Sequence, residues 1–208
     1  MAEKAKTYTR TARRQRHVIV FARTPEFGRV KTRLAREVGA IEAWRFYRTA
    51  TERLVRRLEA DQSWKVWLAL TGSPRRGWPG RHLSMPQGRG SLPVRMERAL
   101  RALPPGDAVL LGSDIPGARP AHICRAFAAL SRARVVFAPA EDGGFWLVGV
   151  RRVPGLPSPL FPEAVRWSHP DTLADVVRGM RLPHAETDML SDVDTAADLL
   201  RAKREGWL

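Results

Sequence analysis

The chain has 208 residues, 44% hydrophobic and 27% charged, a composition typical of one soluble globular domain with a sizeable core. Its single cysteine, Cys124, excludes an internal disulfide and a cysteine-based metal site, and no apolar run approaches the roughly 18 residues that a membrane span needs. The formal net charge of +15 raises the question of a polyanionic partner.

The basic charge is concentrated in the first half of the chain. Residues 1–104 contain 24 Lys and Arg against 8 Asp and Glu, whereas residues 105–208 contain 12 against 13. Six of the bases lie in residues 1–16, which we expect to form a disordered basic tail before a single domain at residues 17–208. No signal-peptide apolar segment follows this tail, so we expect a cytoplasmic protein. A basic half suits phosphate ligands, and an acidic-leaning half can supply metal ligands.

The first predicted element is a buried strand over residues 17–22, a continuous apolar run with β-branched residues at its centre. A loop with Pro and Gly follows, and then a basic segment that leads into a helix. Gly28 permits a backbone turn that a side chain would obstruct, and a helix start offers free N–H groups to an anion. We interpret this loop as a pyrophosphate cradle with Lys31 and Arg33 as its cations; a solvated loop before an amphipathic helix is the alternative. The Walker Gly-Lys-Ser/Thr order is absent.

The next elements are a core-facing helix over residues 41–58 and a strand over residues 64–70. The apolar stripe of the helix is predicted to contain Ile41, Trp44, Tyr47, Leu54, Val55 and Leu58. Residues 71–90 have no periodicity, and a loop of this length is typically functional or disordered. Within it, Pro86-Gln87-Gly88 indicates either a nucleobase contact or an ordinary turn.

Two further strands are predicted to end at carboxylates. A helix over residues 93–103 precedes a strand over residues 108–111, which leads to Asp114. A helix over residues 120–131 and a strand over residues 134–138 then lead to Glu141-Asp142-Gly143-Gly144. The two glycines would let the backbone approach a ligand closely; the alternative is a simple turn into a strand over residues 145–150.

The last part of the chain contains a Pro-rich connection over residues 151–162 and an amphipathic helix over residues 170–180. His169 stands near the start of this helix and either faces a ligand or caps the helix. Asp192 and Asp194 precede a final helix, where Thr195 and Asp198 form a capping box. The cap does not need these two carboxylates, and their presence indicates a metal site.

Strand and helix alternate at least four times, which predicts an α/β fold with a mostly parallel sheet covered on both faces. Loops at the carboxyl ends of the strands would then carry the site. Hard divalent cations prefer carboxylate oxygens, so Mg²⁺ or Mn²⁺ would bridge these aspartates to a nucleotide diphosphate.

Five motifs in register over roughly residues 17–204 resemble the nucleotide-diphospho-sugar transferase superfamily. More closely, they resemble a small bacterial family of glycosyltransferase-like proteins from arsenosugar and radical-SAM gene contexts. The motifs are Phe21-Ala22-Arg23-Thr24-Pro25 with residues 28–34, Pro86-Gln87-Gly88, residues 112–117, residues 139–145 and Asp192-Val193-Asp194-Thr195. The resemblance implies a three-layer α/β/α, Rossmann-like fold of the GT-A type. Two segments depart from the family pattern: Ser91-Leu92-Pro93 replaces Asp-Leu-Gly, and Trp167-Ser168-His169 replaces Trp-Ser-Thr.

The resemblance also implies roles for individual residues. Nucleotide contacts would come from Ala22, Arg23, Thr24, Gly28, Lys31, Arg33, Gln87 and Gly88. Asp114 and Asp194 would bind the metal, with Asp192 as the alternative second ligand. The transferred sugar or the acceptor would face Asp142, Gly143, Gly144 and His169. Asp142 and Lys31 would act in the reaction.

These residues support a metal-dependent transferase that moves a glycosyl group from a nucleotide-diphospho-sugar to a small acceptor. A second hypothesis is a nucleotidylyltransferase, in which a phosphorylated small molecule attacks the α-phosphate of an NTP and pyrophosphate leaves. A third, a nucleic-acid-binding protein, rests on the basic half alone, since no helix-turn-helix, zinc or RNA-binding signature accompanies the charge. A homologue that only binds the ligand is a fourth. The oligomeric state is not predicted by the sequence.

Overall fold

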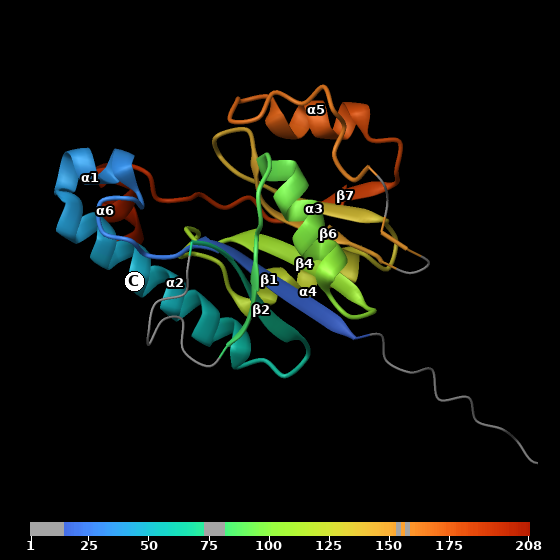
Figure 1. Ribbon diagram of the computed structural model, residues 1–208, viewed down its shortest axis with the longest axis horizontal. Coiled ribbons are helices and arrows are strands. Elements are labelled where there is room, and N and C mark those ends of the chain that lie inside the picture. The colour runs from blue at the N-terminus through green and yellow to red at the C-terminus, as the bar shows by residue number, and fades with distance from the viewer. Residues whose placement is uncertain (1–14, 73–81, 153–154, 157–158) are drawn as a thin grey trace, which may run out of the picture.

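The computed structural model describes residues 15–72, 82–152, 155–156 and 159–208, which form one seven-stranded sheet flanked by helices (Figure 1). The strands are β1 (Arg16–Arg23), β2 (Lys65–Thr71), β3 (Leu83–Pro86), β4 (Asp107–Gly112), β5 (Val135–Pro139), β6 (Phe145–Val150) and β7 (His184–Glu186). The helices are α1 (Thr32–Val38), α2 (Ala40–Glu59), α3 (Leu92–Ala102), α4 (Pro120–Ala129), α5 (Thr172–Gly179) and α6 (Ala196–Arg204). None of these helices is long and apolar enough to cross a membrane.

The strand order is β3-β2-β1-β4-β6-β5-β7, and β6 alone runs against its neighbours. From β1 the chain adds β2 and β3 on one side, then returns to place β4 on the other side. The chain therefore changes direction between β1 and β4, and the loops that leave these two strands diverge from a shared point. In open α/β sheets a ligand crevice forms at such a point, outside the carboxyl ends of the strands.

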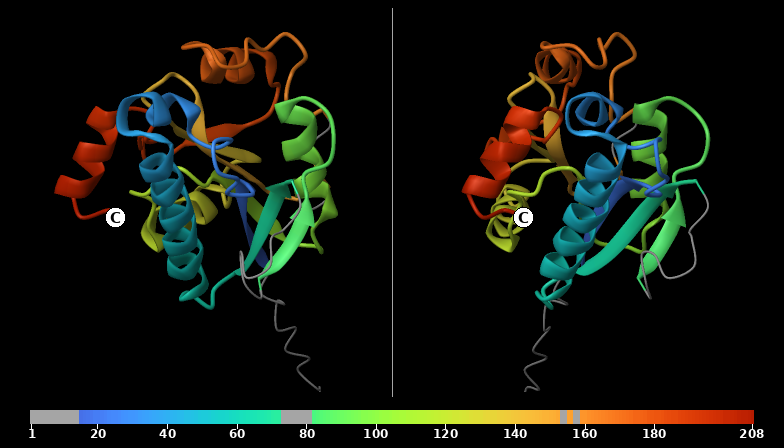
Figure 2. Two further views of the ribbon diagram at one scale, coloured as in Figure 1. Left: turned by 60° about the vertical axis from the view of Figure 1, so that its left-hand side comes forward. Right: turned by 90° about the vertical axis from the view of Figure 1, so that its left-hand side faces the viewer.

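Alternating residues of each central strand pack on opposite faces of the sheet. Val18 and Val20 of β1 pack with α2 and α4, whereas Ile19 packs with α3 and α5. Figure 2 shows α2 and α3 on opposite sides of the sheet. This arrangement confirms the predicted three-layer α/β/α architecture with a mostly parallel sheet. The sequences of β1, β4 and β5 are almost continuously apolar because helices bury both faces of these strands.

A separate small core lies beyond the end of the sheet, where α1, α2 and α6 meet. It contains Leu34 of α1, Phe46 of α2 and Leu199 of α6. Val30 and Val193, from the loops that precede α1 and α6, are buried in the same cluster. This core fixes two segments that are about 160 residues apart in sequence, so the basic loop and the loop of Asp192 and Asp194 lie side by side.

Several expectations need correction. The segment 71–90 contains a strand, β3, and β7 was not predicted at all; both lie at sheet edges and are short and largely exposed. Ile41 is 55% exposed instead of core-facing, whereas Ala43 in the same first turn of α2 is buried. Arg16, assigned to the tail, begins β1. The rest of the expected tail up to residue 14, and residues 73–81 of the expected loop, lie outside the described residues.

Candidate active site

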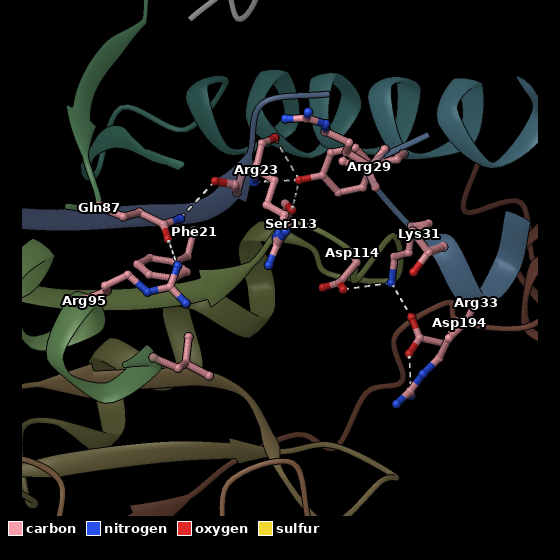
Figure 3. A pocket seen from close by; sticks show the side chains of 15 residues that line it. Phe21, Arg23, Arg29, Lys31, Arg33, Gln87, Arg95, Ser113, Asp114 and Asp194 are labelled. Atoms are coloured by element: carbon pink, nitrogen blue, oxygen red, sulfur yellow. Dashed lines mark hydrogen bonds and ion pairs between the residues drawn. The ribbon is translucent and has the colours of Figure 1, made fainter. Parts of the chain in front are cut away.

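A cleft of about 550 Å³ opens at the carboxyl ends of β1 and β4, where the chain changes direction (Figure 3). It is lined by Phe21, Ala22, Arg23, Arg29, Val30, Lys31, Thr32, Arg33, Tyr47, Gln87, Leu92, Arg95, Ser113, Asp114 and Asp194. Seven of these residues were predicted for the site from the sequence: Ala22, Arg23, Lys31, Arg33, Gln87, Asp114 and Asp194. Five lining side chains are cationic and two are carboxylates, so the cleft has an excess of positive charge that favours a polyanionic ligand.

The basic loop between β1 and α1 is held by side chains of α2. Trp44 donates its Nε1–H to the carbonyl of Pro25 at 2.8 Å, and the hydroxyl of Tyr47 bonds to both backbone groups of Arg23. The same hydroxyl lies 3.2 Å from Ser113 Oγ, which ties the end of β1 to the loop after β4. Gly28 has a φ of +74°, in the left-handed region that glycine adopts at no steric cost.

Lys31 occupies the N-cap position of α1 with a φ of +48°, unusual for a residue that has a Cβ. Its Nζ lies 2.9 Å from Asp114 Oδ2 and 2.7 Å from Asp194 Oδ1, and its side chain is only 6% exposed. Burial favours the neutral amine, but the two carboxylates outweigh it and raise the pKa of Lys31 above its usual value. Lys31 is therefore a buried ammonium between two acidic side chains, which come from the loop after β4 and from the loop before α6.

Arg33, the second predicted phosphate cation, is differently placed. Its Nη1 lies 3.4 Å from Asp194 Oδ2, and its side chain is 80% exposed. Arg29 is equally exposed and pairs with Glu26 at 3.1 Å. Because exposed ion pairs hold a side chain weakly, both guanidinium groups are free to reorient toward a ligand, unlike the buried ammonium of Lys31.

Asp192 completes a group of three carboxylates with Asp114 and Asp194. One carboxylate oxygen of each residue lies within 4.8 Å of the corresponding oxygens of the other two. The three aspartates are therefore close enough to share one metal ion. Burial, together with the negative charge of Asp114, raises the pKa of Asp192 to about 6. The positive charge of Lys31 opposes this rise but does not cancel it. The donor set thus fits a hard divalent cation, for which oxygen ligands are preferred.

Gln87 lies at the far end of the cleft from Lys31 and is 1% exposed. Its side-chain nitrogen donates to the carbonyls of Ala22 and Ala69, each at 2.9 Å, and its Oε1 accepts from Arg95 Nη1 at 2.7 Å. The side-chain amide is thus fully used within the protein. Burial and the neighbouring guanidinium groups of Arg23 and Arg98 lower the pKa of Arg95, so this end of the cleft has uncompensated positive charge.

The Asp142 loop forms the turn between β5 and β6, and it lies at the same sheet edge as the cleft. Asp142 is exposed, and its Oδ1 accepts from the backbone of Gly144 at 3.0 Å. Gly143 has a φ of +83° and packs so tightly that a Cβ would overlap the carbonyl of Pro170. His169 Nδ1 accepts from the backbone of Asp171 before α5, a capping contact.

Eight of the predicted residues are not among those lining the cleft within the described parts of the chain. They are Thr24, Gly28, Gly88, Asp142, Gly143, Gly144, His169 and Asp192. Thr24 Oγ1 donates to the carbonyl of Thr71 and joins the ends of β1 and β2.

Sequence reasoning missed several residues that line the cleft, notably Phe21, Tyr47 and Arg95 as functional side chains. Tyr47 was assigned only to a helical core stripe, and nothing distinguished Arg95 from the other arginines. For Tyr47, a hydroxyl in an otherwise apolar stripe is the available signal, because a buried tyrosine normally bonds its hydroxyl to a partner. Pro93 falls in the first turn of α3, where its missing N–H leaves no intrahelical bond unmade.

Comparisons with known proteins place this fold among those of transferases. A family model described as "Uncharacterized protein conserved in bacteria (DUF2064)" matches residues 54–169, and a search of curated protein sequences gave no match. A candidate nucleotide-diphospho-sugar transferase from Desulfovibrio desulfuricans G20 superposes with a TM-score of 0.79 and 26% identity, over 92% of this chain and 87% of that one.

Two other solved structures share the fold. CMP:2-keto-3-deoxy-manno-octonic acid synthetase, complexed with CTP, has a TM-score of 0.60 and 15% identity over 93% of this chain and 100% of that one. Glucosyl-3-phosphoglycerate synthase from Mycobacterium tuberculosis, complexed with Mn²⁺, UDP and phosphoglyceric acid, has a TM-score of 0.54 and 12% identity over 92% and 75%. The predicted fold, that of the nucleotide-diphospho-sugar transferases, is thereby confirmed.

Proposed function

This chain belongs to the bacterial protein family DUF2064, and from that premise and the geometry of its cleft we propose that it is a metal-dependent transferase acting on a nucleotide-diphospho-sugar. One observation carries the proposal: five cationic side chains and a group of three carboxylates meet at the point where the sheet changes direction. The narrower resemblance, to glycosyltransferase-like proteins of arsenosugar and radical-SAM gene contexts, is part of this proposal.

Asp114, Asp194 and Asp192 would hold Mg²⁺ or Mn²⁺, and a bound divalent cation would supply charge stabilisation for the diphosphate. One fold neighbour, glucosyl-3-phosphoglycerate synthase, is complexed with Mn²⁺ and UDP, which supports the same class of ligand here. Lys31 and Arg33 bind the phosphate oxygens, with Ala22, Arg23, Thr24 and Gly28 forming the backbone of the nucleotide site. Gln87 and Gly88 lie at the opposite, base-binding end.

In the proposed reaction an acceptor hydroxyl attacks the anomeric carbon of the sugar. A new C–O bond forms, the bond between that carbon and the diphosphate breaks, and the nucleoside diphosphate leaves with the electron pair. Asp142 orients the hydroxyl and accepts its proton, while Gly143, Gly144 and His169 face the sugar or the acceptor. Lys31 stabilises the negative charge that develops on the departing diphosphate.

Nucleotidyl transfer is the second candidate, and one observation favours it. Asp142 lies outside the cleft-lining residues in the described chain and bonds to its own loop, whereas Lys31 lies deep within the cleft. Attack of an already ionised phosphate on the α-phosphate of an NTP needs no strong base. CMP:2-keto-3-deoxy-manno-octonic acid synthetase, a fold neighbour complexed with CTP, is named for nucleotidyl transfer of this kind.

Product analysis separates the two reactions. The purified protein is incubated with Mg²⁺ or Mn²⁺ and either a panel of nucleotide-diphospho-sugars with acceptor mixtures, or NTPs with sugar phosphates. Release of nucleoside diphosphate supports glycosyl transfer, and release of pyrophosphate supports nucleotidyl transfer. Asp114→Asn is the matched inactive control, and Asp61→Asn, a half-buried carboxylate in the turn after α2, controls for charge. Binding of neither class of nucleotide, with or without metal, would contradict both reactions.

The basic half of the chain is the reason for the alternative that the protein binds nucleic acid. The same purified protein can be used to test it. Binding driven by counterion release falls steeply with salt and does not depend on Asp114. We propose instead that the ligand is a nucleotide with a small-molecule acceptor, because the cations line a cleft of about 550 Å³, which is the size of a small-molecule site.

A further inference from the structure

The side-chain amide of Gln87 has a fixed orientation. Its nitrogen faces the carbonyl oxygens of Ala22 and Ala69, which can only accept hydrogen bonds. Its Oε1 is therefore the atom that faces Arg95, and it accepts from Arg95 Nη1 at 2.7 Å. With both amide hydrogens donated to the ends of β1 and β2, Gln87 has no donor left for a ligand.

Arg95 is also held by Phe21, and the loop of Gln87 is held by Arg98. The guanidinium carbon of Arg95 lies over the ring of Phe21, 5.8 Å from the centroid. One helical turn later, Arg98 Nη1 donates to the carbonyls of Gln87 and Arg89 at 2.7 and 2.8 Å, which fixes the loop against α3. A guanidinium group that is anchored in this way loses little conformational freedom when it binds a ligand.

Arg95, which lines the cleft, retains unused donors. Its Nε is buried without a hydrogen-bond partner, and its Nη2 makes no hydrogen bond to any residue that the structure describes. An unpaired buried donor is costly, so this group is suited to a ligand acceptor. Figure 3 shows Arg95, Phe21 and Gln87 at one end of the cleft, and Lys31, Asp114 and Asp194 at the other.

The two ends of the cleft would bind different parts of a nucleotide. A nucleotide whose diphosphate is bound at Lys31 and the carboxylates extends its nucleoside toward Arg95. Guanine, cytosine and uracil each carry a carbonyl oxygen that accepts hydrogen bonds, whereas adenine carries none and accepts only at its ring nitrogens. A guanidinium group has five donors and no acceptor, so it matches the carbonyl oxygen of the first three bases better than it matches adenine.

We propose that Arg95 selects nucleotides with a carbonyl-bearing base over adenine nucleotides, and that Gln87 is the positioning residue that holds Arg95 for this contact. This inference rests on the proposed function, because it assumes that the cleft binds a nucleotide. It assigns base recognition to a side chain of α3 rather than to the glutamine amide, which is used up by the ends of β1 and β2.

The test measures calorimetric affinities of the full chain for GDP, CDP, UDP, ADP and inorganic pyrophosphate in the presence of Mg²⁺. At least one of the three carbonyl-base nucleotides is expected to bind about tenfold or more tightly than ADP, the effect of a charge-assisted hydrogen bond. Arg95→Met should abolish this preference and leave pyrophosphate affinity unchanged. Arg101→Met, on the same helix but paired with Glu97 at the surface, removes the same charge and should leave the preference intact.

Two more variants test the geometry. Arg95→Lys keeps the charge but not the planar fork, so it should retain pyrophosphate binding and lose the base preference. Gln87→Met, with its folding checked by thermal unfolding, should lose the preference while pyrophosphate affinity is retained; a purely structural role would weaken both ligands alike.

Equal affinity of the unaltered chain for ADP and the other nucleotides would overturn the inference. So would an Arg95→Met variant that loses pyrophosphate affinity to the same degree as nucleotide affinity, because Arg95 would then be a phosphate contact. In both cases the proposed function stands. Absence of binding by any nucleotide and by pyrophosphate would instead overturn the proposed function itself.

Discussion

Lys31 Nζ lies 2.7 Å from Asp194 Oδ1, in the space between the carboxylates that are suited to a divalent cation. The ammonium group balances part of the negative charge of this group of aspartates. A divalent cation bound here would therefore compete with the lysine for the same oxygens, and the diphosphate of the proposed nucleotide would offer Lys31 an alternative set of anionic partners. In this scheme the lysine moves from carboxylate to phosphate as nucleotide and metal enter together.

The first prediction concerns this competition. Lys31→Met should raise the affinity for Mn²⁺ in the absence of nucleotide by about tenfold or more, since it removes a charge-assisted partner from the carboxylates. The same variant should bind nucleoside diphosphates more weakly. Electron paramagnetic resonance of free Mn²⁺ measures the first effect, and calorimetry the second. Lys65→Met, an exposed lysine of β2, is the control, and weaker Mn²⁺ binding by Lys31→Met would refute the competition.

The second prediction concerns proton transfer. If Asp142 accepts the proton of the acceptor hydroxyl, Asp142→Asn should lower kcat for glycosyl transfer by about 10²- to 10⁴-fold, with little change in nucleotide affinity. Glu141→Gln is a matched control, because Glu141 is adjacent and exposed but pairs with Arg201. An Asp142→Asn protein with full turnover would remove Asp142 from the chemistry and favour nucleotidyl transfer, which requires no such base.

The third prediction concerns the hydroxyl that joins two strand ends. Tyr47→Phe removes the partner of both backbone groups of Arg23 and of Ser113 Oγ. Because buried groups are then left without a hydrogen bond, the free energy of unfolding should fall by about 1–3 kcal/mol. Urea unfolding measures this loss. Nucleotide affinity should fall as well, since the basic loop begins at Arg23; an unchanged unfolding midpoint would show that the network contributes nothing.

The fourth prediction concerns pH and stability. His17 is fully buried, with Nδ1 accepting from Trp67 Nε1 at 3.1 Å, and burial lowers its pKa although the carbonyl of Pro105 opposes this. The unfolded chain takes up a proton near pH 6.5, whereas the folded chain stays neutral until a lower pH. Stability is therefore lost as the pH falls below about 6.5, by at most about 1.4 kcal/mol per pH unit, and the loss ends below the folded pKa.

His17→Gln should remove this contribution, so the difference in unfolding free energy between the two proteins should narrow between pH 7 and pH 5. Denaturant titrations across that range provide the measurement. Two parallel stability curves would show that His17 does not carry the dependence.

The sequence predicted the elements whose apolar pattern reflects burial. β1, β4 and β5 are covered by helices on both faces, so each appears as an apolar run, and the glycines and prolines that follow mark the ends. β3 and β7 could not be found in this way. They are short edge strands with exposed side chains, and they depend on pairing with β2 and β5 instead of on their own residues.

The same distinction applies to the site. Asp114 and Asp194 could be predicted from the sequence because neither carboxylate is needed by the secondary structure around it. Asp114 follows an apolar strand, and Asp194 precedes a helix that is already capped by Thr195 and Asp198. Their contact with Lys31 depends on the small core of α1, α2 and α6, which brings together segments far apart in sequence. Arg95 is one arginine among many, and only the fixed amide of Gln87 distinguishes it.

The reversed direction of β6 determines how many loops can reach the cleft. Two adjacent parallel strands require a crossover of a dozen or more residues, and the second strand would then begin at the opposite edge. Because β6 is antiparallel, the chain that leaves β5 turns back within residues 140–144 and remains at the ligand-facing edge. Ladder hydrogen bonds to β4 and β5 hold β6 on both sides, so Asp142 stands on a short hairpin, and its distance from the proposed acceptor would be set by the sheet.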